Sequence, residues 1–115
     1  MVMAATPQPV LTGVWGDARA TLTLTPTGGA FIEECQTATL TGPVHVHDNR
    51  FTTTAKREVV HSGPQQADVA PEYTELHFQG RLLPGHIDLE IHAVGSPIER
   101  HQLIANRHTK AHRCN

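Results

Sequence analysis

Histidine is the residue type in this chain that could do the most chemistry. There are 9 histidines among the 115 residues, several times ordinary usage. Imidazole titrates close to neutral pH, and its neutral form binds transition metals, so each histidine is a candidate acid, base or metal ligand. Which of them could act together depends on the strands that carry them.

Two pairs of histidines have the spacing of metal ligands. His45 and His47 form a His-X-His pair, and on a strand both side chains would point the same way and offer two nitrogens to Zn or Cu. His77 and His92 are predicted to lie opposite each other in a hairpin, with their Cβ atoms about 5 Å apart. Either pair needs further ligands to bind a metal tightly. The alternative for both is a solvated polar face of a sheet.

Glu33 is the carboxylate that could act with a histidine. In the segment 31–35, alternation puts Phe31, Glu33 and Cys35 on one face. If Cys35 is buried, Glu33 points inward, where it needs a partner or its pKa rises; a His or Arg from the last strands could serve. A Glu–His pair inside a small barrel would then be the best candidate reactive site. A register slip that puts Glu33 in solvent is the alternative.

His61 and His101 are the histidines considered for catalysis with Glu33. His61 begins a long loop, residues 61–71, and could pack at a barrel mouth. His101 belongs, with His108 and His112, to a basic C-terminal region that could attract an anion, although a solvated strand also explains it. The chain contains no Gly-X-Ser-X-Gly, His-Glu-X-X-His or Cys-X-X-Cys motif, so no known nucleophile or metalloprotease pattern is present.

Short extended segments separated by turn residues must position these side chains. They are predicted at residues 18–25, 30–35, 38–41, 44–47, 51–60, 73–82, 87–94, 98–105 and 111–114. With no helical pattern, this spacing predicts an all-β protein, a small antiparallel, lipocalin-like barrel of about eight strands, with a sandwich as the alternative. Residues 1–10 are predicted to be a flexible N-terminal arm, and residues 11–115 a single barrel domain.

The composition limits the partners. Hydrophobic residues make up 38% of the chain, charged residues 17%, and the formal net charge is −2. This is enough apolar material for a small core, and no apolar run is long enough for a membrane span. Because basic residues are not clustered along most of the chain, nucleic acid is not the expected partner. The expected partner is a small molecule or a protein, and the choice between a monomer and a homodimer is left open.

Cys35 and Cys114 allow one disulfide bond but do not demand it. If they lie on neighbouring strands, the bridge would close a loop of about 80 residues and stabilise the fold by around 4 kcal/mol. Two free thiols in a cytosolic protein are the alternative. Residues 1–9 lack the pattern of a signal peptide, so the protein is either cytoplasmic or has lost a leader.

Several short motifs suggest a family. In chain order they are Gly13-Val14-Trp15-Gly16, Cys35, Gly42-Pro43, Arg50-Phe51, His61-Ser62-Gly63-Pro64 and His112-Arg113-Cys114. The series resembles a group of small, uncharacterised bacterial exported β-barrel proteins. The resemblance implies a bridged barrel with a periplasmic or secreted location, and no particular activity. The chain departs from that group at Glu33, His101 and His112, where the resemblance predicts aromatic or apolar residues.

Three functions follow from these patterns. The first is an exported binding module for a small ligand or a protein partner. The second is a histidine-rich metal-binding protein or a small hydrolase that uses a divalent metal such as Zn or Cu. The third is a metal-free acid–base enzyme built on Glu33 and a nearby histidine.

Overall fold

The computed structural model describes residues 9–33, 36–58 and 72–107, and these residues form a closed antiparallel barrel. The strands are β1 (Gly13–Gly16), β2 (Thr21–Thr25), β3 (Gly28–Glu33), β4 (Gln36–Leu40), β5 (Arg50–Glu58), β6 (Tyr73–Leu83), β7 (His86–His92) and β8 (Glu99–Ala105). Each strand pairs with the next in the chain, and β8 pairs back with β1. The prediction of an all-β barrel is therefore confirmed, in its closed form.

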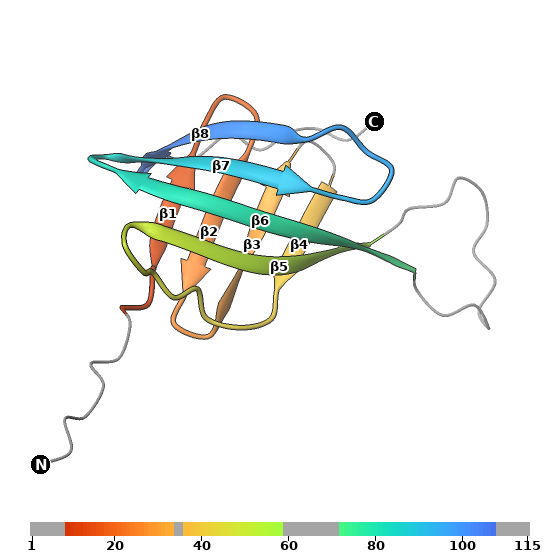
Figure 1. Cartoon of the computed structure of the whole chain (residues 1–115), viewed down its shortest axis with the longest axis horizontal. Coiled ribbons are helices and arrows are strands. Elements are labelled where there is room, and N and C mark those ends of the chain that lie inside the picture. Colours follow the sequence, from red (N-terminus) through yellow and green to blue (C-terminus); the bar gives the residue numbers. More distant parts are fainter. Residues whose placement is uncertain (1–8, 34–35, 59–71, 108–115) are drawn as a thin grey trace, which may run out of the picture.

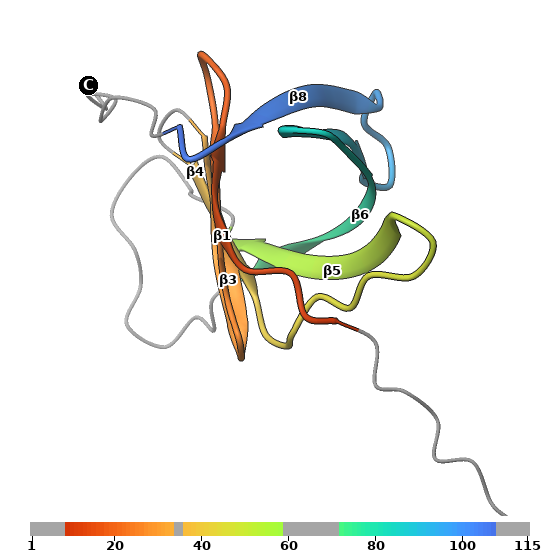
Figure 2. The ribbon, with the colours of Figure 1, turned by 90° about the vertical axis from the view of Figure 1, so that its left-hand side faces the viewer.

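The strands form two layers that cross at a steep angle (Figure 1). One layer contains β1 to β4 and the other β5 to β8; Figure 2 shows the first layer nearly edge-on, with β5, β6 and β8 curving around the space beside it. Short ladders join the layers, from Ala38 and Thr39 of β4 to β5 and from Trp15 and Gly16 of β1 to β8. The side chains enclosed between the layers form the core.

The core follows the period-two alternation of the sequence. In β6, Leu76, Phe78 and Gly80 are buried, and the residues between them are exposed. A Cβ atom on Gly80 would lie 2.1 Å from the ring of Phe51, so this position must be glycine for the ring to fit. The buried cluster consists of Ala20, Leu22, Leu24, Phe31, Ala38, Leu40, Val44, Phe51, Ala55, Leu76, Phe78, Ile87, Leu89, Ile91 and Leu103.

The hairpin of β6 and β7 has the register that the sequence predicts. His77 lies opposite His92, and Leu82 lies opposite Ile87. Gly85 adopts a φ of 78° in the connecting turn, a conformation that glycine takes without strain. The short connection and the apolar alternation of both arms therefore sufficed to set this register.

The predicted strand at residues 44–47 is wrong. The segment makes only isolated bridges, at His45 and at His47. Pro43 precedes it and cannot donate a ladder hydrogen bond, and the chain turns immediately after it at Asp48 and Asn49, which have φ values of 50° and 60°.

The end of the predicted N-terminal arm is paired with this segment. The carbonyl of Pro9 accepts a hydrogen bond of 2.9 Å from the N–H of Val46, and Leu11 donates one of 2.8 Å to Val44. Pro9 and Val10 are therefore held against the segment that precedes β5. Residues 1–8, the loop 61–71 and the predicted strand 111–114 lie outside the described residues. Within the described ranges, no helix is long and apolar enough to cross a membrane.

Candidate functional site

Five ionisable side chains gather at one end of the barrel. This polar cluster consists of Asp17, Glu33, Arg57, Glu99 and His101. Asp17 directly follows β1, Glu33 ends β3, Arg57 lies near the end of β5, and Glu99 begins β8 two residues before His101. The strand ends of both layers therefore supply the cluster.

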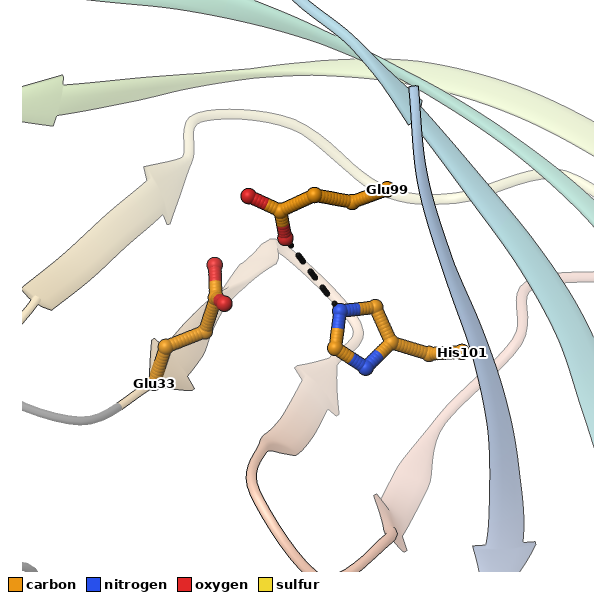
Figure 3. A group of neighbouring side chains, drawn as sticks. All are labelled: Glu33, Glu99 and His101. Carbon is orange, nitrogen blue, oxygen red and sulfur yellow. Dashed lines mark hydrogen bonds and ion pairs between the residues drawn. The ribbon is translucent and has the colours of Figure 1, made fainter. Parts of the chain in front are cut away.

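The same alternation that builds the core turns these side chains inward. In β3, Glu33 follows buried Phe31 by two residues, and in β8, His101 precedes buried Leu103 by two. Residues two apart on a strand share a face, so the polar side chains continue the two inner rows of the core. Figure 3 shows Glu33, Glu99 and His101 converging from β3 and β8.

His101 is the central residue of the cluster. Its side chain is only 8% exposed, with Nδ1 2.8 Å from Oδ2 of Asp17 and Nε2 3.3 Å from Oε2 of Glu99. Its ring meets the ring of Phe31 edge to face, with centroids 5.4 Å apart. Burial alone would lower the pKa of His101, but the hydrogen bonds to Asp17 and Glu99 outweigh it and raise the pKa above its ordinary value.

Asp17 is held in place by the turn between β1 and β2. Its Oδ1 atom accepts hydrogen bonds of 2.7 Å from the N–H groups of Arg19 and Ala20. Burial would raise the pKa of Asp17, but the hydrogen bond from His101 and these backbone bonds together lower it. Asp17 is therefore an ionised acceptor at neutral pH.

Glu33 and Arg57 form an ion pair, each with a side chain 19% exposed. Burial is the largest influence on Glu33 and raises its pKa, and the charge of Glu99 and a hydrogen bond with it act in the same direction. Arg57 and His101 oppose this rise without reversing it. Glu33 therefore holds its proton more tightly than an ordinary glutamate does.

Glu33, Glu99 and His101 could together hold a metal ion. One potential ligand atom from each lies within 4.8 Å of the others, and none of the three residues is fully exposed. Two carboxylates and one imidazole are ligand types that Zn²⁺ and similar divalent ions accept. Among the residues that the structure describes, this is the one such group of three or more.

The histidines predicted as metal ligands do not join it. His45 and His47 are exposed and line a shallow surface depression with Asp48 and Arg50. His47 lies 3.3 Å from Asp48, its own neighbour in the turn. Neither histidine belongs to a described group of three ligands.

His77 and His92 lie on the outer face of β6 and β7, opposite each other as expected. Each ring is close to a glutamate of its own strand: Nε2 of His77 is 3.8 Å from Glu75, and Nε2 of His92 is 3.4 Å from Glu90. The pair has no third ligand that would complete a described group. A solvated polar face describes it better than a metal site does.

Of the three residues considered for catalysis, the structure brings Glu33 and His101 together. The interpretation of His101 as part of a solvated strand is wrong, because Phe31, Asp17 and Glu99 enclose its ring. His61 lies outside the described residues, as do His108, His112, Cys35 and Cys114. The disulfide bond therefore stays a prediction.

Asp17, Arg57 and Glu99 were not predicted from the sequence. A signal for Glu99 was present, since alternation puts it on the same face as His101 and Leu103. The sequence contains no such signal for Asp17 or Arg57, because no local pattern links either residue to a partner on another strand.

Comparison with known proteins found no matching family model, no matching curated protein and no matching solved structure. The resemblance to exported bacterial barrels therefore stays a prediction.

Proposed function

We propose that this protein is a small β-barrel that binds a divalent metal ion through Glu33, Glu99 and His101. The observation that carries the proposal is the convergence of two carboxylates and one imidazole at one end of the interior, with ligand atoms within 4.8 Å of one another. This is a form of the second function expected from the sequence, a metal-binding protein, with ligand residues other than the histidine pairs that the spacing suggested.

The distances suit a metal after a small adjustment. A zinc ion binds nitrogen and oxygen ligands at about 2 Å, so it joins ligand atoms up to about 4 Å apart. Nε2 of His101 and Oε2 of Glu99 already meet this limit at 3.3 Å. Rotation of the Glu33 side chain would close the remaining difference, and three protein ligands leave a coordination position open for water or a substrate.

The charge of the cluster also favours a cation. Once Glu33 has lost its tightly held proton, three carboxylates face one guanidinium and one imidazolium, which leaves a net charge of about −1. A divalent ion that displaces the proton of His101 brings the cluster to neutrality. An organic ligand deep inside the barrel has less support, because apolar side chains occupy that space.

The proposal is tested by titrating the untagged, chelator-treated protein with Zn²⁺ and Mn²⁺ in a calorimeter. One ion per chain is expected, and Glu33→Gln or Glu99→Gln should each weaken binding by about 100-fold or more, since loss even of groups behind the ligands costs 10- to 100-fold. The matched control is the double variant His77→Ala, His92→Ala, which removes two surface imidazoles and should bind as the wild type does. Absence of stoichiometric binding, or an equal loss in the control, would contradict the proposal.

The raised pKa of Glu33 favours a second function, metal-free acid–base catalysis. Burial and Glu99 keep a proton on Glu33 at a pH where most glutamates have lost theirs, which suits a general acid. Activity on activated esters or glycosides that survives chelation, has a bell-shaped pH profile and disappears in Glu33→Gln would support it. Activity that needs added Zn²⁺ would instead favour hydrolysis through a metal-bound water.

The location of the protein stays a prediction. The resemblance implies export to the periplasm or the medium, and the cytoplasm stays open. A metal site of oxygen and nitrogen ligands is compatible with an exported and with a cytoplasmic location.

A further inference from the structure

We infer that Asp17 is a positioning residue that fixes the tautomer of His101. The proton of the neutral ring is then on Nδ1, and the lone pair of Nε2 points toward Glu33 and Glu99. The consequence for metal binding rests on the proposed function, but the tautomer itself can be measured without a metal.

Asp17 has the anchorage that such a role requires. Its Oδ1 atom accepts the N–H groups of Arg19 and Ala20, and its own N–H donates to the carbonyl of Ala20 over 2.9 Å. The β1–β2 turn is therefore built around this carboxylate. Oδ2 is directed at Nδ1 of His101, 2.8 Å away.

The direction of this hydrogen bond determines the tautomer. An ionised carboxylate can only accept, so Nδ1 must carry the proton that it shares with Asp17. A neutral imidazole has one N–H group, and the lone pair is then on Nε2. Histidines that bind metals have this arrangement, with a carboxylate holding the N–H of the ring nitrogen that does not bind.

Glu99 competes with Asp17 for the proton of the neutral ring. Nε2 lies 3.3 Å from an oxygen of Glu99, a longer contact than the 2.8 Å between Nδ1 and Asp17, so the shorter hydrogen bond keeps the proton on Nδ1 and leaves a lone pair on Nε2 facing an acceptor. Only a cation between them, a proton or a metal ion, reconciles the two groups. The ring of Phe31 packs edge to face against the imidazole and restricts a ring flip that would exchange the nitrogens.

Asp17→Asn separates this role from the structural one. The asparagine carbonyl can still accept the two backbone N–H groups, but its amide would donate to Nδ1. Nδ1 must then be the acceptor, and Nε2 acquires the proton. Nitrogen NMR of the imidazole, at a pH where His101 is neutral, should show Nδ1–H in the wild type and Nε2–H in the variant. Zinc affinity should fall by about 10- to 100-fold.

Asp48→Asn is the matched control. Asp48 is also an aspartate beside a histidine, 3.3 Å from Nε2 of His47, but it is exposed and outside the cluster. The substitution Asp48→Asn should leave the zinc affinity and the His101 tautomer unchanged.

The outcomes separate the two proposals. A wild-type His101 protonated on Nε2 overturns the inference about Asp17, whatever metals do, and so does an Asp17→Asn variant with unchanged tautomer and affinity. A wild type with Nδ1–H and the expected change in the variant, but without zinc binding, overturns the metal function and leaves the positioning role standing.

Discussion

The two ends of the barrel interior differ in chemistry although the same alternation builds both. One part is packed with apolar side chains around Phe78, and the other holds the polar cluster around His101. Phe31 lies between them, with its ring 5.4 Å from the ring of Phe78 and 5.4 Å from that of His101. Moving two residues along β3, from Phe31 to Glu33, is enough to pass from one region to the other.

The contrast separates the apolar region, which stabilises the fold, from the proposed metal site. Burial of apolar surface stabilises the fold by about 25 cal/mol per Å². Ion pairs in a protein interior gain little on balance, because removing charges from water costs about as much as their attraction returns. Apolar residues at Glu33 and His101 would extend the core, so the charged cluster is better explained by a site than by a need for stability.

The largest expected effect is in the apolar part. Phe78→Ala should lower the free energy of unfolding by about 3–5 kcal/mol, because it leaves a cavity among buried side chains. Denaturant unfolding followed by circular dichroism measures this. A loss below about 1 kcal/mol would mean that the apolar region does not carry the stability.

A smaller effect is expected in the cluster. Arg57→Met leaves Glu33 half-buried beside Glu99 without its guanidinium, and should cost about 1–3 kcal/mol at neutral pH. Adding Glu33→Gln should restore much of the loss, because the unpaired charge is then gone. A double variant as unstable as the sum of its parts would show that the two residues do not interact.

The pH dependence of stability should distinguish the cluster from the core. His101 has a raised pKa in the folded protein, so its contribution is fully present below its ordinary pKa of 6.5 and is lost as pH rises through the higher folded value. From about pH 6 to about pH 9, the wild type should therefore lose more stability than His101→Gln does. Parallel pH profiles of the two proteins would contradict the assigned contacts.

The smallest effect is expected on the outer face. His77→Ala removes a side chain that is 55% exposed and should change stability by less than about 0.5 kcal/mol. Thermal unfolding of this variant, compared with Phe78→Ala at the next position, measures the inside–outside contrast within one strand. A large loss of stability in His77→Ala would mean that the outer face of β6 is packed against other residues.

Local pattern was sufficient for most of the fold and part of the site. Alternation in β6 and β7 predicts which residues enter the core and that His77 faces His92. The pattern fails at residues 44–47, where Pro43 and a turn leave only isolated bridges. The alternation also suggests that Glu33 points inward, but it does not identify the residues that contact Glu33.

The sequence by itself determined most of the strands, their inner faces and one hairpin register, although β1 was not predicted and the strand at residues 44–47 was wrong. Side-chain direction on a strand repeats every two residues, and short turns leave few alternatives. Only the tertiary structure decided that Asp17 meets His101 across 84 positions of the chain, and that Glu33, Glu99 and Arg57 join them. Such contacts depend on how the two layers cross and close, which is a property of the whole chain.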